Sequence, residues 1–476
     1  MMHNTIRSNR NIKTILLGVI SILLIAYFTL LSYRQLLYAT PVYDNDYKTF
    51  YMSLRDPMTV YDDHFYMRVY GYFKEKGDKK IQAKTSPTLT AVNMNTPLMC
   101  LFLRGLVNVS HSLNINSLVF AVCSVFCGLV GFAFLLRIFD KVNPWYVPAL
   151  FLLLYFSWPS FSALKLGQVS YLVLPFLSLG FLLVYRKQYT VSAVILGFVA
   201  AVKLFFLIFL IFYCVRMDWR RTVIFLGSFL VFFFLPVLYF HWPVYHDFYK
   251  LTQNHFIFIS HATFSMNGSL LGVIVRAESV FNLPFTNTQT NLLLLLLSVY
   301  SLVKYAAYDF KVLNALPELS DALRISFLIV LAITLSPLGW VYYFIFIAVP
   351  VCVFFKISER YALTRTFFVF LSLAFVLPYV AWLQPATHVM WFCVGLTPFL
   401  SLLCWMICLC SATNSVRYQR LRSEDKRPVL FAVLFIQVLA SIILLYANFG
   451  MPYFLDLFKK EYVANTMPAI SLPPKH

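Results

Sequence analysis

The chain has little charge for its length, and acidic residues are especially few. Of its 476 residues only 12% are charged, about half the share usual in soluble domains. Hydrophobic residues make up 61%, aromatic residues 18%, and the mean hydropathy is +0.76. A soluble fold of this length has too little interior to bury so much apolar surface. The composition therefore excludes soluble, disordered and fibrous classes and predicts a membrane protein.

The scarcity of acids leaves a net charge of +19, from 38 Lys and Arg against 19 Asp and Glu. In a soluble chain this excess would suggest a nucleic-acid partner. In a membrane protein the simpler explanation is the enrichment of Lys and Arg in cytoplasmic loops. We therefore predict membrane lipids, and no nucleic acid, around this chain.

The sequence also lacks the signatures of disulfide and metal sites. Its nine cysteines form no C-x-x-C pair and mostly lie in apolar runs, which favours packing over disulfides or zinc ligation. The triplet Asp44-Asn45-Asp46 brings two carboxylates together, but a hard cation prefers roughly six or more oxygen ligands. No cluster of His and carboxylates suggests another metal. Neither a metal nor a cofactor is expected.

Long apolar runs are abundant, and about 11 of them approach the roughly 20 residues that a spanning helix needs. They lie near residues 12–33, 115–138, 145–162, 169–185, 221–240, 289–307, 323–337, 339–355, 366–383, 389–410 and 429–447. The first lacks a convincing cleavage site, so it is expected to be a span and not a signal peptide. No repeat or Gly/Ser-rich linker divides the chain. The sequence predicts one integral-membrane domain, 1–476, with an all-α polytopic fold.

Lys and Arg in the short loops predict the orientation. Arg7, Arg10 and Lys13 precede the first run without an acid, which places the N-terminus in the cytoplasm. The basic loop 411–428 falls on the same side. The loops 34–95 and 241–268 then lie on the periplasmic or extracellular side of the cell inner (plasma) membrane.

The run 190–215 does not fit a single crossing, because basic residues such as Lys187 and Arg216 flank it on both sides. Two short helices forming a hairpin keep both flanks inside. The tip then lies near Lys203, the one charge in the run. A lysine at the centre of a membrane helix costs roughly 2.5–3.5 kcal/mol on insertion scales. It either snorkels to the interface or faces a phosphate at an outward tip.

The loop 34–95 is too long and too polar to be a simple connector. Residues 46–54 are amphipathic at helical spacing, which predicts an interfacial helix lying on the membrane surface. Its apolar face comprises Tyr47, Phe50, Tyr51 and Leu54. Asp46 precedes this face in the N-cap position. The residue either caps the helix or holds a carboxylate at the water–lipid boundary for chemistry.

Short motifs follow one another between about residues 40 and 345. They are Asp46-Tyr47 with Tyr61-Asp62, Asn95-Thr96-Pro97-Leu98, Gly167-Gln168-Val169, Ala200-Ala201-Val202-Lys203, Asn267-Gly268-Ser269-Leu270 with Arg276, and Ser336-Pro337-Leu338-Gly339-Trp340. In this order they resemble glycosyltransferase family 87, integral-membrane enzymes of the GT-C type. After the final Trp, family members often have Asp-His-His. This chain has Val341-Tyr342-Tyr343 instead.

The resemblance implies a GT-C-type fold and inverting transfer of a hexose, mannose being the best-known case, without a metal. The donor would be a polyprenyl-phosphate-linked sugar, and the acceptor a glycolipid or glycan. A carboxylate would deprotonate the acceptor hydroxyl; we assign this role to Asp46, with Asp44 as the runner-up. Cations would stabilise the departing phosphate. The candidates are Lys203, Arg276 and Lys165.

Other side chains of these motifs are predicted to contact the sugar or the acceptor. They are Asp44, Gln168, Asn267, Ser269, Trp340, Tyr342 and Tyr343. Alternatives stay open: helix–helix hydrogen bonding for the two amides, headgroup anchoring for Arg276, and an aromatic-belt position for the tyrosines. The orientation from Lys and Arg places all of these motifs on the outer side. We therefore expect Asp46, Lys203 and Arg276 to line one outward cavity.

Other membrane classes share some of these features. A transporter or lipid flippase also combines many spans with intramembrane charges, but it should show inverted repeats with paired broken helices, and none is found. A glycan polymerase or ligase of the same membrane-enzyme class differs only in substrates. A non-catalytic scaffold is a further alternative. The motifs favour a glycosyltransferase.

Overall fold

The structure is a computed structural model of the 476-residue chain. It describes scattered residues between 23 and 36, and residues 46–54, 60–61, 95–139, 157–253, 264–283, 287–315, 317–358, 365–380 and 388–415. These residues are largely helical, and the one β-bridge among them joins Asn267 to Trp340. The predicted run 429–447 and most of 12–33 and 145–162 lie outside them.

The first half of the described chain contains short helices and one long apolar helix. These are α2 (Asp46–Ser53), α5 (Pro97–Val107), α6 (Leu113–Leu136), α8 (Trp158–Leu166), α9 (Ser170–Tyr185), α10 (Tyr189–Val202), the 3₁₀ helix η2 (Leu204–Phe209), α11 (Leu210–Val215) and α12 (Trp219–Phe234). The second half comprises α13 (Val237–Phe240), α14 (Pro243–Gln253), α16 (Leu270–Phe281), α17 (Asn287–Ala315), α18 (Ser320–Leu335), the 3₁₀ helix η3 (Val341–Ile347), α19 (Ala348–Ser358), α20 (Arg365–Val380) and α21 (His388–Ser415).

Five helices of the described residues are long and apolar enough to cross a membrane. They are Leu113–Leu136, Trp219–Phe240, Thr288–Tyr308, Val341–Ser358 and Val389–Thr413. The prediction of an all-α, multi-pass membrane protein is confirmed at this level, but the count of about 11 spans is not. Three predicted spans, 169–185, 323–337 and 366–383, correspond to helices of only 16 residues.

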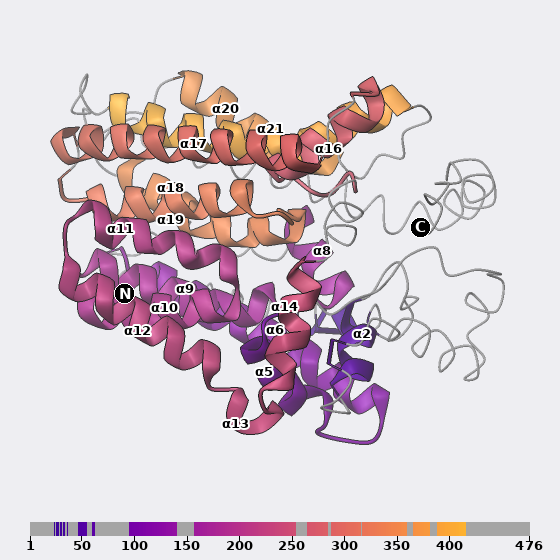
Figure 1. Ribbon diagram of the computed structural model, residues 1–476. Coiled ribbons are helices and arrows are strands. Elements are labelled where there is room, and N and C mark those ends of the chain that lie inside the picture. Colours follow the sequence, from indigo (N-terminus) through magenta and orange to yellow (C-terminus); the bar gives the residue numbers. More distant parts are fainter. Residues whose placement is uncertain are drawn as a thin grey trace, which may run out of the picture.

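The helices form two groups that run roughly side by side (Figure 1). One group contains α6, α9, α10 and α12, and the other contains α17 to α21. Within the second group, α18 lies against the first, where it contacts α9 and η2, and all its residues from Ser320 to Thr334 are buried. A helix that is apolar around its whole circumference is expected in the interior of a bundle. The α2 and α8 helices lie near one end of the bundle, on the right of Figure 1.

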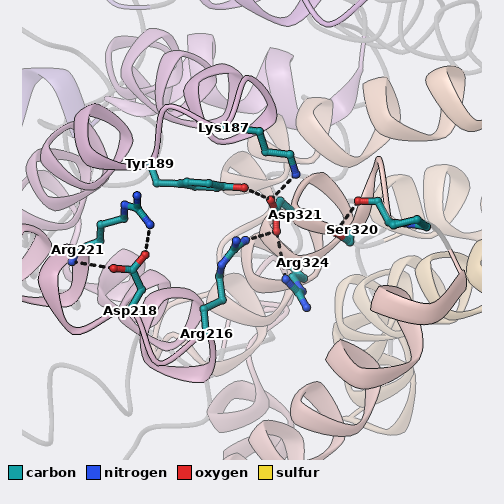
Figure 2. A network of polar contacts seen from close by, with 9 residues as sticks. Lys187, Tyr189, Arg216, Asp218, Arg221, Ser320, Asp321 and Arg324 are labelled. Carbon is teal, nitrogen blue, oxygen red and sulfur yellow. Dashed lines mark hydrogen bonds and ion pairs between the residues drawn. The ribbon is translucent and has the colours of Figure 1, made fainter.

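The segment 190–215 has the predicted hairpin shape. The 14 residues of α10 extend about 21 Å, and η2 with α11 extends back over a similar length, short of the ~30 Å hydrocarbon core. Lys203 lies between the two arms with an extended backbone, φ −138° and ψ 104°. Lys187 and Arg216, which flank the arms, both pair with Asp321 at the first turn of α18 (Figure 2). Both flanks therefore lie at the same end.

Candidate active site

The α2 helix holds Asp46 against the bundle by its aromatic face. Tyr47, Phe50, Tyr51 and Leu54 are all buried, and the Tyr47 ring centroid lies 4.8 Å from that of Phe120 in α6. The predicted helix is thus present with its aromatic face buried, and its position on the membrane surface stays a prediction. Asp46 is the first residue of this helix, not the residue before it. Its Oδ2 accepts a hydrogen bond from Nε2 of Gln168.

Gln168 reaches Asp46 because the chain makes a sharp turn after α8. Gly167 adopts a left-handed conformation with φ +67°, as is common at helix C-termini. The backbone N–H of Gln168 then donates to the Ala163 carbonyl at 2.8 Å. A Cβ atom on Gly167 would lie 2.5 Å from Cβ of Tyr47. The absence of a side chain therefore lets α2 approach closely enough for the bond between Gln168 and Asp46.

Gly167→Ala is expected to reduce strongly the sugar transfer that the family resemblance implies, because the new methyl group would push α2 and Asp46 away. A displacement of about 1 Å at a reacting group can cost as much as 100-fold in rate. Gly105→Ala in α5 is the matched control, since a Cβ there meets nothing within 4 Å. Transfer assays on membranes with equal amounts of each variant measure the effect. Equal activity of the two variants would contradict this role of Gly167.

Lys203, at the tip of the hairpin, lies near this carboxylate and is surrounded by polar side chains. The side chain is buried, and its Nζ donates to Oδ1 of Asn95 at 2.9 Å and to the Tyr343 hydroxyl at 3.4 Å. Hydrogen bonds to neighbouring segments also hold Asn95 and the adjacent Thr96 in place. The Tyr61 hydroxyl donates to the Asn95 carbonyl, and Thr96 Oγ1 donates to the Val202 carbonyl at 3.0 Å. The Lys203 ammonium is therefore held in place and does not extend freely towards a headgroup.

The start of η3 closes the cluster with two tyrosines. Both tyrosines are buried, their ring centroids lie 4.8 Å apart, and Tyr342 lies close enough to Gln168 and Asp46 to interact with them electrostatically. The Trp340 ring stacks on Tyr342 with centroids 5.8 Å apart and an interplanar angle of 14°. Residues far apart in sequence thus meet in one polar cluster: Asp46, Asn95, Gln168, Lys203, Tyr342 and Tyr343.

The electrostatics of this cluster suit a base that works near neutral pH. Burial raises the pKa of Asp46 from 3.8 to about 6, and the nearby positive charge of Lys203 opposes that rise. Asp46 is half-buried, and partial removal from water disfavours its ionised form. The positive charge of Lys203 favours the ionised form and so limits the rise in pKa. A carboxylate tuned in this way accepts a proton more readily than an ordinary aspartate.

Asn267 and Ser269 lie in a second group, which holds the turn after α18. Asn267 Nδ2 and Ser269 Oγ donate to the Pro337 carbonyl at 3.3 and 3.1 Å. Ser269 Oγ also accepts from the Gly272 N–H as the N-cap of α16. Gly268 N–H donates to the Gly339 carbonyl at 2.8 Å. Two of the sequence motifs thus pair with each other and fix the turn that leads to Trp340.

Arg276 belongs to the same second group. Its side chain is fully buried, and its guanidinium donates to the backbone carbonyls of Phe264, Asn267 and Gly395 at 2.8, 2.9 and 2.6 Å. These bonds tie α16, the 264–268 segment and α21 together. In this structure Arg276 therefore connects parts of the fold. Its binding of a donor phosphate stays a prediction.

Two further predicted site residues are not placed in detail. Asp44 lies outside the described residues, and Lys165 lies in α8 with a side chain that is not described. Asn95 was not predicted as a site residue, although its motif stands out in the sequence. Among the described residues no three His, Cys, Asp or Glu side chains gather as a metal site would require.

The family of the chain follows from its sequence. The model of glycosyltransferase family 87 matches residues 96–337, just over half of the chain. The chain belongs to glycosyltransferase family 87. The matched region contains Gln168, Lys203 and Arg276 and ends at Pro337, whereas Asp46 and Trp340 lie outside it. No curated protein and no solved structure matches the chain. As a family 87 member it is a membrane glycosyltransferase, acting on a sugar donor and an acceptor.

Proposed function

We propose that this protein moves a hexose, such as mannose, from a polyprenyl-phosphate-linked donor to a lipid or glycan acceptor, with Asp46 as the general base. The observation that carries the proposal is the polar cluster around Asp46. A carboxylate of raised pKa, a buried lysine and two tyrosine hydroxyls meet where α2, the hairpin tip and η3 come together. A base and a cation side by side are what transfer from a phosphate requires.

The chemistry assigns a task to each group. The acceptor hydroxyl attacks the anomeric carbon and gives its proton to Asp46, forming the new glycosidic C–O bond. The bond from that carbon to the phosphate oxygen breaks, and its electron pair stays on the lipid phosphate, which gains one negative charge. The Lys203 ammonium stabilises that charge, and Tyr343 adds a hydroxyl donor. Attack opposite the departing phosphate inverts the anomeric centre.

A small apolar cavity beside η3 marks where the first part of the donor's hydrocarbon chain would contact the protein. It is partly open, lies among α8, η3, α19, α20 and α21, and has a volume of about 30 Å³, too small to hold the chain itself. Its lining is Ser157, Pro159, Phe344, Ile345, Ile347, Ala348, Ala374, Phe375, Pro378 and Trp405. Phe344 directly follows Tyr343 in η3. One short helix therefore presents hydroxyls at the polar cluster and apolar side chains at the cavity, which fits a sugar phosphate that carries a hydrocarbon chain.

The wild-type protein in liposomes is expected to transfer a labelled hexose from a polyprenyl-phosphate donor to extracted membrane acceptors. Its kcat/KM should rise with pH and level off above about pH 6, because the transfer needs ionised Asp46, whose pKa is about 6. Chromatography of labelled products over a pH series measures both results. A rate that falls as pH rises through this range would contradict the assignment of Asp46 as base. If the protein used a nucleotide sugar as donor and not the polyprenyl-phosphate-linked sugar, the proposed donor would be wrong.

We also propose that the active site opens on the periplasmic or extracellular side of the inner membrane. In right-side-out vesicles, Lys203→Cys is expected to react with a small membrane-impermeant thiol reagent added outside. Lys187→Cys, half-exposed at the opposite end of the hairpin arms, is the matched control and should react only after the vesicles are opened. Peptide mass spectrometry separates both sites from the nine native cysteines. The reverse pattern would invert the topology.

A further inference from the structure

One carboxylate, Asp321, joins three segments of the bundle (Figure 2). Its Oδ2 accepts hydrogen bonds from Lys187 Nζ at 2.7 Å and from the Tyr189 hydroxyl at 2.6 Å. Its Oδ1 accepts from Arg324 Nη1 at 3.1 Å and from Arg216. The Asp321 side chain is only 3% exposed. Removal of this carboxylate would leave several cations without their common partner.

The groups that Asp321 binds include both ends of the hairpin. Lys187 and Tyr189 stand where α10 begins, and Arg216 directly follows α11. The two ends also contact each other, because the Arg216 guanidinium lies 4.5 Å from the centre of the Tyr189 ring. Asp321 therefore fastens both arms of the hairpin to the first turn of α18.

The hairpin and α18 meet again at their other ends. The α18 helix continues through the Ser336–Trp340 turn into Tyr343, whose hydroxyl accepts from Lys203 at the hairpin tip. Along the way η2 packs against α18. The hairpin and α18 are thus connected at two places. Asp321 binds the ends of the hairpin arms, and Tyr343, which follows α18, binds Lys203 at the hairpin tip.

We propose that Asp321 is a positioning residue for sugar transfer: by fastening the hairpin arms to α18, it holds Lys203 beside Asp46 and the donor phosphate. The inference rests on the proposed function, since the position of Lys203 matters to transfer only if Lys203 serves the phosphate. If Asp321 only stabilised the fold, its replacement would change only the amount of folded protein. A positioning residue also changes the surroundings of Asp46.

The test compares Asp321→Asn with Asp218→Asn. Asp218 is a second carboxylate of the same region, but it is the N-cap of α12 and accepts hydrogen bonds from Arg221 in the first turn of that helix. The probe is a hydrophobic carbodiimide, which reacts with protonated carboxyl groups, and peptide mass spectrometry follows its attachment to Asp46 across a pH series. Because no substrate is needed, this readout succeeds or fails independently of the proposed function, which the transfer assay tests separately.

In Asp321→Asn the hairpin loosens, Lys203 withdraws, and the midpoint of Asp46 modification is expected to move up by about one pH unit, as for the loss of a nearby opposite charge. Transfer should fall roughly tenfold at neutral pH per folded molecule, from the same loss of positioning. In Asp218→Asn both are expected to stay at wild-type values. Asp321→Glu, which keeps the charge, should restore most of the wild-type midpoint.

An unchanged midpoint in folded Asp321→Asn protein would overturn the proposal and leave Asp321 a structural residue. If Asp321→Asn does not fold, Tyr189→Phe decides the question, because it removes one bond to Asp321 and keeps the aromatic ring and all charges. Its midpoint should move in the same direction by a smaller amount. No movement in Tyr189→Phe would then count against the proposal.

Discussion

Replacing Asp46 with Asn is expected to reduce transfer by roughly 100- to 10,000-fold, the range that a general base contributes. Asn has nearly the same shape and can still accept the hydrogen bond from Gln168 through its Oδ1. It cannot take the proton of the acceptor hydroxyl. Binding of the donor needs no ionised Asp46, so the loss should fall on kcat and leave the KM for the donor nearly unchanged.

The fold should tolerate this change. Burial raises the pKa of Asp46 above its value in the unfolded chain, so the ionised form opposes folding as pH rises through the interval between the two values. A neutral Asn removes that cost, and the thermal unfolding temperature at neutral pH should be equal or higher. Asp247→Asn in α14, where the carboxylate is 47% exposed, is the control and should keep full activity. Wild-type rates in Asp46→Asn would exclude Asp46 as the base.

The sequence predicted those parts of the site that depend on local pattern. The aromatic spacing of Tyr47, Phe50 and Tyr51 is enough to indicate α2, because one face of a short helix must be buried. Basic residues on both flanks are enough to indicate the hairpin, because they disfavour a single crossing. Both features follow from rules that act within a few turns of helix. The structure shows both of them.

Contacts between distant segments could not be predicted in this way. Gln168 and Asp46 are 122 residues apart, and their bond depends on the turn at Gly167 and on the packing of Tyr47 against it. Asn95 stands out in a motif, but only the packing of its segment on the hairpin makes it a partner of Lys203. A motif states which residue types are present and not which atoms meet.

The same limit explains Asn267, Ser269 and Arg276. Their side chains suit a sugar or a phosphate, but in a membrane protein backbone carbonyls at turns also need donors. Here the turn after α18 supplies such a carbonyl at Pro337, and the segments around Arg276 supply three more. Sequence alone does not reveal whether a polar side chain binds substrate or satisfies the fold.

Replacing Lys203 with Met should give the second large loss, about 100- to 1,000-fold in kcat, as for removal of a donor that stabilises transition-state charge. Methionine has a similar length and no charge, so the tip keeps its packing while the phosphate loses its cation. The remaining activity should also depend differently on pH. Without the charge that now lowers the pKa of Asp46, the acidic limb of kcat/KM should move up by about one pH unit.

These two effects separate Lys203 from a lysine that only packs or snorkels. A snorkelling lysine could be removed with little loss, and the acidic limb would stay near pH 6. Lys250→Met, at the exposed end of α14, is the matched control and should change neither quantity. Steady-state rates of Lys203→Met over a pH series give both numbers from one experiment. A large loss of rate with an unmoved limb would place Lys203 at the phosphate but away from Asp46, and so would contradict the single polar cluster on which the proposed mechanism depends.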